Sequence, residues 1–208
     1  MPGVTVIDHP LVQHKLSLLR CRETGTRPFR RLMRELATMV GYEVLRDLDL
    51  VRRTIETPLA RMEAPFLKTG GPVLISVLRA GNGLLDGMLE LVPSAPVGYI
   101  GLVRDPHTLQ ASEYYFKVPC DLADRPVVVL DPMLGTANTA LAALSRLKGA
   151  SARSIRLMSL LAAPEGIDAV ARAHPDVAVF TAAIDRSLDD HGYLVPGLGD
   201  AGDRLCET

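Results

Sequence analysis

The chain contains few cysteines, almost no net charge and no long apolar run. Its three cysteines, Cys21, Cys120 and Cys206, are odd in number and widely spaced, and no CxxC pair occurs. This usage predicts three reduced thiols and argues against a disulfide or metal framework. The formal net charge of -1 excludes the general attraction to nucleic acid or anionic lipid that a strongly basic protein shows.

Membrane and secretion signals are missing as well. The longest apolar run, Leu157 to Ala163, is broken by Ser159 and is far too short to cross a bilayer. Met1 to His9 has no basic segment followed by an apolar stretch, so no signal peptide is expected. These features predict a soluble cytoplasmic protein. A chain of 208 residues, 48% hydrophobic and 23% charged, is typical of one globular domain spanning 1–208.

The first part of the chain has helical periodicity. Pro10 can open a helix that runs to Leu19, and a break follows at Thr24 to Thr26. From Pro28 to about Leu48, apolar residues recur at spacings of three and four, which predicts an amphipathic helix. The N-terminal part, about 10–50, is therefore expected to be helical.

After Gly70-Gly71, short apolar runs alternate with helical stretches. The runs are Val73–Leu78, Val97–Val103, Val127–Leu130, Ile155–Leu161 and Val177–Ala183. The helical stretches are Leu84–Leu91, Thr139–Lys148 and Ile167–Ala173, with Gly149 as the expected C′ residue of the second. Continuous apolar runs are typical of strands buried on both faces. The alternation therefore predicts an α/β fold with an open, mainly parallel sheet over about 73–183, flanked by helices.

Two segments lack this alternation. Between Val103 and Val127 no helix is indicated, and Tyr114-Tyr115-Phe116 gives the segment an aromatic centre. We expect a hairpin arm there, with its aromatic side chains against a partner subunit. The last segment, Gly192 to Asp203, has four glycines and is expected to be irregular. Such a loop can wrap a planar base with main-chain groups, or it can be a plain connector.

Ligands of open α/β sheets bind beyond the carboxyl ends of the strands, and the strongest candidate there follows the run 127–130. Asp131 ends the strand, a loop of small residues carries the hydroxyls of Thr136 and Thr139, and a helix begins. Main-chain N–H groups at a helix start bind phosphate, and Asp131 could accept hydrogen bonds from sugar hydroxyls. The spacing also fits an ordinary strand–helix turn. A P-loop is excluded because no lysine follows.

Two arginines stand at the ends of other predicted strands. Arg79 follows the run 73–78 and precedes Ala80-Gly81-Asn82-Gly83, so its guanidinium can face a phosphate with close approach of the backbone. Arg104 has the corresponding place after Val103. Alone, each arginine is better explained as a surface residue beside a turn. Together with the loop after Asp131, they form a candidate site for a phosphorylated ligand.

The chain resembles the uracil phosphoribosyltransferases, a family of type I phosphoribosyltransferases, over essentially its whole length. The stretches that carry the resemblance are His9–Leu16, Leu78–Gly81, Thr108-Leu109, Tyr114-Tyr115, Asp131–Leu134, Ala162–Gly166, Ala173–Val177 and His191–Asp203. The last of these is highly specific to the family. The resemblance implies the type I phosphoribosyltransferase fold, with N-terminal helices, a hairpin arm and a C-terminal base-binding hood at 192–203.

The resemblance also implies a reaction, in which uracil and phosphoribosyl pyrophosphate (PRPP) give UMP and pyrophosphate with Mg²⁺. Arg79 and Arg104 would hold the pyrophosphate, and Asp200 would face the reacting sugar or the metal ion, which is bound mainly through PRPP. The ribose 5-phosphate and the sugar hydroxyls would be held by Asp131, Pro132, Met133, Leu134, Gly135, Thr136, Ala137, Asn138 and Thr139. The uracil edge would be read by Leu194, Gly199, Asp200 and Ala201, largely through main-chain groups.

This chain departs from the family pattern near the implied substrate sites. The family's loop usually has the sequence Ala-Thr-Gly-Gly-Ser, whereas residues 135–139 are Gly-Thr-Ala-Asn-Thr. An alanine forced into the left-handed region costs about 1–2 kcal/mol, unless Gly135 shifts the turn. Asn82 replaces a leucine, and Ser76-Val77 replaces Pro-Ile. Two alternatives therefore stay open: a weakly active or non-catalytic paralogue with a regulatory role, and an enzyme for another base.

The resemblance implies partners in addition to uracil and PRPP. A homodimer or homotetramer is expected. GTP activates some members of the family, although no motif here assigns a site for it. Neither nucleic acid nor membrane is an expected partner.

Overall fold

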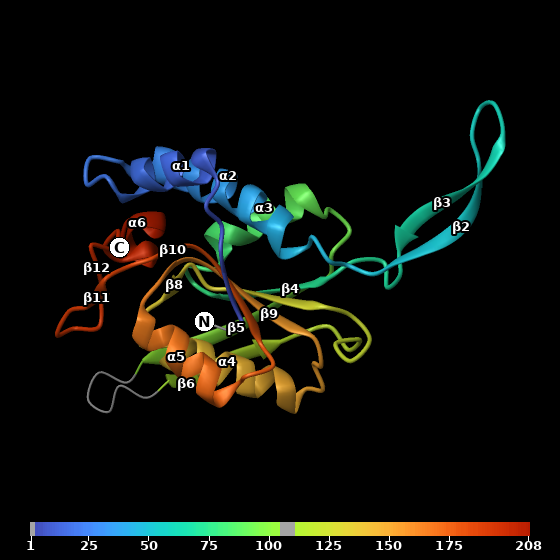
Figure 1. Cartoon of the computed structure of the whole chain (residues 1–208). Coiled ribbons are helices and arrows are strands. Elements are labelled where there is room, and N and C mark those ends of the chain that lie inside the picture. The colour runs from blue at the N-terminus through green and yellow to red at the C-terminus, as the bar shows by residue number, and fades with distance from the viewer. Residues whose placement is uncertain (1–2, 105–110) are drawn as a thin grey trace.

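A mainly parallel sheet forms the centre of the molecule (Figure 1). In the computed structural model, which describes residues 3–104 and 111–208, its strand order is β1-β10-β9-β7-β4-β5-β6, with β8 beside β9. These strands are β1 (Val4–Val6), β4 (Val73–Leu78), β5 (Val97–Arg104), β6 (Ala111–Lys117), β7 (Val127–Leu130), β8 (Met133–Leu134), β9 (Ile155–Ala162) and β10 (Ala178–Ile184). Only β6 is antiparallel to its neighbour within this described sheet.

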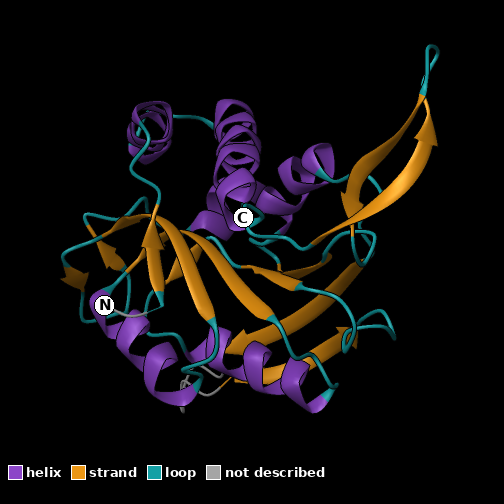
Figure 2. Cartoon of the chain, turned by 45° about the vertical axis from the view of Figure 1, so that its right-hand side comes forward, coloured by secondary structure: helices purple, strands orange, loops and turns teal. Residues whose placement is uncertain are grey.

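Helices cover both faces of the sheet, which confirms the predicted α/β fold (Figure 2). One face carries α1 (Pro10–Arg20), α2 (Thr26–Val44) and α3 (Asn82–Leu91). The other carries α4 (Asn138–Gly149) and α5 (Pro164–Ala173). Successive residues of a strand point to opposite faces, so Leu74 joins the core under α1–α3 while Ile75 joins the core over α4 and α5. This two-sided burial explains the continuous apolar runs.

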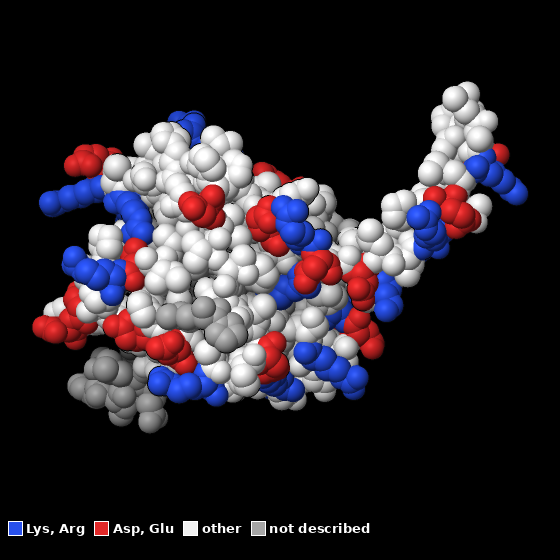
Figure 3. Space-filling view, in the orientation of Figure 1, with Lys and Arg blue, Asp and Glu red and all other residues white. Residues whose placement is uncertain are grey.

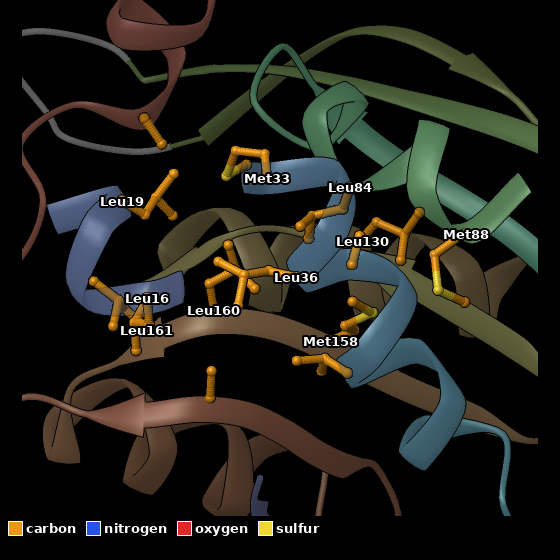
Figure 4. Close-up of a cluster of buried hydrophobic side chains, with 14 of the residues drawn as sticks. Leu16, Leu19, Met33, Leu36, Leu84, Met88, Leu130, Met158, Leu160 and Leu161 are labelled. Atoms are coloured by element: carbon orange, nitrogen blue, oxygen red, sulfur yellow. The ribbon is translucent and has the colours of Figure 1, made fainter. Parts of the chain in front are cut away.

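The larger part of the core lies between the sheet and the first three helices. Figure 4 shows Leu36 of α2 and Leu84 of α3 directed toward Leu130 of β7 and Met158 of β9. All four side chains are fully buried. The periodicity predicted for residues 10–19 and 28–48 is confirmed, although α2 begins earlier, at Thr26, and ends at Val44.

The arm that projects from the body is not the predicted one. It consists of β2 (Leu50–Glu56) and β3 (Arg61–Leu67), which pair antiparallel in a sheet of their own (Figure 1). The segment predicted as an arm instead adds β6 to the edge of the main sheet beside β5, and its residues 105–110 lie outside the described part. The sequence concealed the true arm because most of its side chains are exposed on both faces, so no one-sided alternation marks it.

The predicted helix end at Gly149 is also wrong. Gly149 is the last residue of α4, and the left-handed C′ position falls on Ser151, whose φ is 70°. Ser151 N–H donates to the Lys148 carbonyl at 2.9 Å, and Ala152 N–H donates to the Leu147 carbonyl at 3.0 Å. These two bonds form a Schellman motif, so a serine does here what was expected of the glycine.

The C-terminal segment folds over the carboxyl edge of the sheet as a small hood. It contains a hairpin of β11 (Ser187–Leu188) and β12 (Leu194–Val195), followed by α6 (Ala201–Cys206). The carboxylate of Asp189 closes the hairpin tip by accepting from the N–H groups of His191 and Tyr193 at 2.9 and 2.8 Å. The segment 192–203, predicted to be irregular, therefore includes a short strand and the start of a helix.

Surface features agree with the composition. Lysine, arginine and acidic side chains are interspersed over the face shown in Figure 3, as the near-zero net charge implies. The three cysteines are free and exposed. None of the described helices has both the length and the apolar character needed to cross a membrane.

Candidate active site

The carboxyl ends of β4, β5 and β7 open into a cavity of about 410 Å³ beneath the hood. The cavity brings together segments separated by more than a hundred residues. The residues predicted from the sequence that line it are Arg79, Asp131, Met133, Leu134, Gly135, Thr136, Ala137, Asn138, Thr139, Leu194, Gly199, Asp200 and Ala201. Arg79 and the loop after Asp131, which follow the carboxyl ends of two strands, therefore line one cavity together with the hood.

Two predicted residues are not among those that line the cavity. Pro132 is buried beneath it, and its carbonyl accepts from the N–H groups of Leu160 and Leu161 at 3.0 and 3.1 Å. It thereby anchors the loop to β9. Arg104 is the last residue of β5, two positions beyond the lining residue Leu102, and its side chain lies outside the described part of the structure.

The loop after β7 presents main-chain N–H groups to the cavity. Helix α4 begins at Asn138, and its N-cap, Ala137, has no side-chain hydrogen bond to the first turn. The N–H groups of that turn are therefore suited to binding an anion, which the helix dipole also favours. Helix α5 supports the loop from behind, because a Cβ at Gly166 would lie 2.3 Å from the Gly135 carbonyl oxygen. No residue with a side chain fits at Gly166 without moving the loop.

The strained residue of this loop is Ala137. It has φ 66° and ψ 0°, in the left-handed region, whereas Asn138 is already helical. The loop therefore places an alanine in the left-handed region, as the comparison with the family pattern anticipated, and Gly135 does not shift the turn. Gly135 has a different role, because a Cβ there would lie 3.2 Å from the Gly192 carbonyl oxygen. It permits close approach of the loop 135–139, the predicted phosphate loop, to the hood.

Asp131 is half-buried at the floor of the cavity. Burial raises the pKa of its carboxyl to about 6, and the hydrogen bond from the main-chain N–H of Met133 only partly opposes that rise. The carboxyl is therefore half-ionised at about pH 6 and mostly ionised at neutral pH. Hydrogen bonds from sugar hydroxyls would stabilise its ionised form.

Arg79 is held on a tight turn between β4 and α3. The Leu78–Arg79 peptide bond is cis, and Gly81 N–H donates to the Val77 carbonyl at 2.9 Å. A Cβ at Gly81 would lie 2.4 Å from the Leu130 carbonyl oxygen, so the turn is packed against β7. The Ser76 hydroxyl, fully buried, donates to Asn82 Oδ1 at 2.9 Å across the same turn. Ser76 and Asn82, which both depart from the family pattern, thus form a hydrogen bond with each other.

The guanidinium of Arg79 remains accessible. Its side chain is 55% exposed and lies 3.5 Å from an Asp203 carboxylate oxygen. It also donates to the hydroxyl of Thr208 at 3.3 Å. An exposed ion pair at this distance contributes little to stability. An incoming polyanion can therefore readily displace the Asp203 carboxylate from Arg79.

The end of the cavity that was predicted to bind the base is formed by the hood. Leu194 is buried, Gly199 has φ 77°, and Asp200 caps α6 by accepting from Asp203 N–H at 2.9 Å. Four further lining residues of the hood had no role assigned from the sequence: His191, Gly192, Tyr193 and Gly202. The signal that could have found them was their place in the family-specific stretch His191–Asp203.

The acidic residues of the cavity fit a cation that arrives with its substrate. The described residues contain no group of three or more His, Cys, Asp or Glu side chains able to hold a metal ion. Among residues 3–104 and 111–208, Asp131 and Asp200 are the acidic residues that line the cavity. Since Mg²⁺ is commonly bound by one or two carboxylates together with substrate phosphates, these residues suit Mg²⁺ coordinated mainly by a pyrophosphate.

Comparisons with known proteins agree with this geometry. The sequence model of the uracil phosphoribosyltransferase family matches residues 6–208. Uracil phosphoribosyltransferases of Mesorhizobium japonicum and Acidovorax sp. are 62% and 57% identical to this chain over 208 residues, covering all of both sequences.

Solved structures of similar proteins share the fold of this chain. A protein of Aquifex aeolicus, 36% identical, has a TM-score of 0.93 and covers 97% of both chains. A hypoxanthine-guanine phosphoribosyltransferase of Bacillus anthracis, 12% identical, covers 77% of this chain and 80% of its own with a TM-score of 0.52, which shows a shared fold. The chain therefore has the type I phosphoribosyltransferase fold and belongs to the uracil phosphoribosyltransferase family.

Proposed function

We propose that this protein transfers the phosphoribosyl group of PRPP to uracil, which gives UMP and pyrophosphate. The observation that carries the proposal is the single cavity in which a phosphate-type loop, Arg79 and the hood meet. Each part suits one portion of the two substrates. Full-length identity of 57–62% to uracil phosphoribosyltransferases favours an active enzyme over a regulatory paralogue.

The loop 135–139 is proposed to hold the 5-phosphate through the N–H groups at the start of α4 and the hydroxyls of Thr136 and Thr139. Asp131, at the floor of the cavity, accepts hydrogen bonds from the ribose hydroxyls. Binding there fixes C1 of the sugar between the pyrophosphate and the base. Such positioning removes much of the entropic barrier of a two-substrate reaction.

The charges of the site suit the transfer step. As the bond from C1 to the pyrophosphate oxygen breaks, the leaving group takes the electron pair and C1 gains oxocarbenium character. Arg79 and Arg104 are proposed to stabilise the departing pyrophosphate, and Asp200 to face the positively charged sugar. Uracil N1 forms the new bond to C1 and loses its proton. Asp200 would help to hold the Mg²⁺ that arrives mainly through PRPP, and the ion would supply positive charge at the leaving group.

Uracil is proposed to be recognised by main-chain groups of Leu194 and of Gly199 to Ala201. The O2, N3–H and O4 groups of uracil form an acceptor–donor–acceptor edge. A pocket whose donors and acceptors match that edge leaves buried groups unpaired against cytosine, which penalises the wrong base strongly.

The protein is further proposed to form a homodimer or homotetramer. Tyr114 and Tyr115 of β6 are exposed at the edge of the main sheet, and a partner subunit would cover them. Phe116 already packs against the core of its own chain, beneath the guanidinium of Arg146. GTP is retained as a candidate activator of this enzyme.

The test is turnover of labelled uracil with PRPP and Mg²⁺, with and without GTP. We expect UMP and pyrophosphate in equal amounts, loss of turnover when EDTA removes the metal ion, and poor turnover of cytosine. Absence of UMP under all of these conditions, from protein that is folded by circular dichroism, would refute the proposal. Efficient turnover of another base would instead support the alternative that the protein is an enzyme for that base.

A further inference from the structure

A buried ion pair lies behind the hood, away from the cavity. Asp185 follows β10 and is only 4% exposed. Arg20, in the last turn of α1, donates to both of its carboxylate oxygens at 2.5 and 3.0 Å. Neither residue is among those that line the cavity, so neither is placed to contact substrate.

The ion pair forms hydrogen bonds with both main-chain polar groups of Gly197, a residue of the hood. Gly197 N–H donates to Asp185 Oδ2 at 2.8 Å, and the Gly197 carbonyl accepts from Arg20 at 2.7 Å. Three groups, the guanidinium, the carboxylate and the main chain of Gly197, therefore form a closed hydrogen-bonded arrangement. Charge-assisted bonds of this kind are stronger and more directional than neutral ones.

A second arginine fixes the next residue. Arg204 of α6 donates to the Leu198 carbonyl at 2.8 Å and to the Leu19 carbonyl at 2.9 Å. It also reaches the turn between α1 and α2, and its guanidinium stacks over the ring of Phe29 at 4.5 Å. Consecutive carbonyls of the hood are thus fastened to the same N-terminal helices.

These contacts bear directly on the base-reading segment. Gly197 has φ 61°, and a Cβ there would lie 2.1 Å from the Leu194 carbonyl oxygen. Leu194 is therefore folded back tightly onto Gly197, and Gly199 follows two residues later. Whatever fixes Gly197 sets how Leu194 and Gly199 face each other across the base site.

We infer that Arg20 and Asp185 are positioning residues for base recognition, which hold the main chain of 194–201 in the geometry that matches uracil. The inference rests on the proposed function. A pocket that reads its ligand with main-chain groups has no side chains of its own to set its precision. That precision comes from the side chains that hold the main chain in place.

Stability alone does not account for the pair. Replacing a buried ion pair with apolar residues of similar volume is often neutral or stabilising, because the pair loses its hydration on burial. An apolar replacement that packs well would therefore preserve the fold but leave Gly197 without its two charged partners. This difference separates a positioning role from a merely structural one.

The experiment compares Arg20→Lys and the double variant Arg20→Met/Asp185→Leu with the parent in steady-state assays of UMP formation. Lysine keeps the charge but not the two-pronged geometry. For both variants we expect the KM for uracil to rise about tenfold or more, the effect of losing an oriented hydrogen bond in the base site. Discrimination between uracil and cytosine should fall, whereas the KM for PRPP should change much less.

Glu35→Gln is the matched control. It breaks the ion pair between Glu35 and Lys15, 2.6 Å long, which also ties α1 to a neighbouring helix. Within the described part of the chain, no hydrogen bond or ion pair joins these two side chains to residues 194–201, so the KM for uracil should stay at the parent value. Thermal unfolding of every variant measures the accompanying change in stability.

An unchanged uracil KM and unchanged base discrimination in a folded double variant would overturn the inference. Should the double variant fail to fold, Arg20→Lys decides, and equal increases of the KM for uracil and PRPP would contradict a role specific to the base. A parent protein that forms no UMP is a different outcome, which refutes the proposed function itself.

Discussion

Replacing Asp131 with asparagine should stabilise the free protein while impairing its activity. Asparagine has nearly the same shape and its Oδ1 can keep the hydrogen bond from Met133 N–H, but it does not ionise. In the folded chain the pKa of Asp131 is raised from 3.8 to about 6 by burial. Ionising this residue therefore costs the folded state more than the unfolded state, and the substitution removes that cost.

The pH dependence fixes the sign and the size of the effect. Below the unfolded pKa both states are protonated, so parent and variant should differ little. As pH rises from about 4 to about 6, the unfolded state releases its proton first and the parent loses stability. The loss is complete above the folded pKa and amounts to at most about 3 kcal/mol, from a shift of about two units at 1.36 kcal/mol each.

Urea unfolding of ligand-free protein at pH 4 and pH 7.5 is the assay. We expect a higher midpoint for Asp131→Asn at pH 7.5 and a similar midpoint at pH 4. Asp200→Asn is the control: it removes a charge from the same cavity at an exposed position, and asparagine caps a helix as well as aspartate does. The reasoning would be refuted if the urea midpoint of Asp131→Asn did not exceed that of the parent at pH 7.5, or if the difference were larger at pH 4. Turnover of Asp131→Asn should fall about ten- to hundredfold, the range of one charge-assisted hydrogen bond.

Four further changes test other parts of the site and its surroundings. Arg79→Ala and Arg104→Ala should each weaken PRPP binding or turnover about ten- to hundredfold; calorimetric titration checks this, and unchanged affinity and rate in both would contradict the pyrophosphate assignment. Ala137→Gly should leave stability within about 1 kcal/mol of the parent. It relieves about 1–2 kcal/mol of backbone strain, but it loses a buried methyl group worth about 0.8 kcal/mol and adds about 0.4–1 kcal/mol of chain entropy to the unfolded state. A larger change in urea unfolding would contradict that balance. Gly166→Ala should push α5 from the phosphate loop, cost about 1–3 kcal/mol and raise the KM for PRPP; a thermal midpoint and KM equal to the parent's would show that the contact is not constraining. Light scattering should give a dimer or tetramer, and a monomer mass of 22.5 kDa would refute the proposed interface near Tyr114 to Phe116.

The sheet and the cavity could be predicted because their signals are local. Strands buried on both faces, such as β4 and β7, leave continuous apolar runs. The carboxyl ends of parallel strands meet at one edge, so the sequence alone is enough to place Arg79 and Asp131 together. The family resemblance then added the hood, whose glycines and aspartates alone do not reveal a ligand.

The remaining features depend on tertiary structure. The arm 50–67 was missed because exposed side chains on both faces leave no periodic signal. The sequence left open whether Ala137 or a turn shifted to Gly135 would take the left-handed conformation, because the outcome depends on how Gly135 packs against the hood and against Gly166 of α5. Arg20 and Asp185 are 165 residues apart, and no local pattern links them.

Binding of the product tests most directly whether this cavity performs the transfer. A crystal structure of the protein with UMP should place the 5-phosphate against the main-chain N–H groups at the start of α4. The uracil edge should lie against Leu194 and Gly199 to Ala201, and Arg79 should face the side of the ribose from which pyrophosphate departs. UMP bound outside this cavity, or with its base toward 135–139 and its phosphate toward the hood, would contradict the assignment.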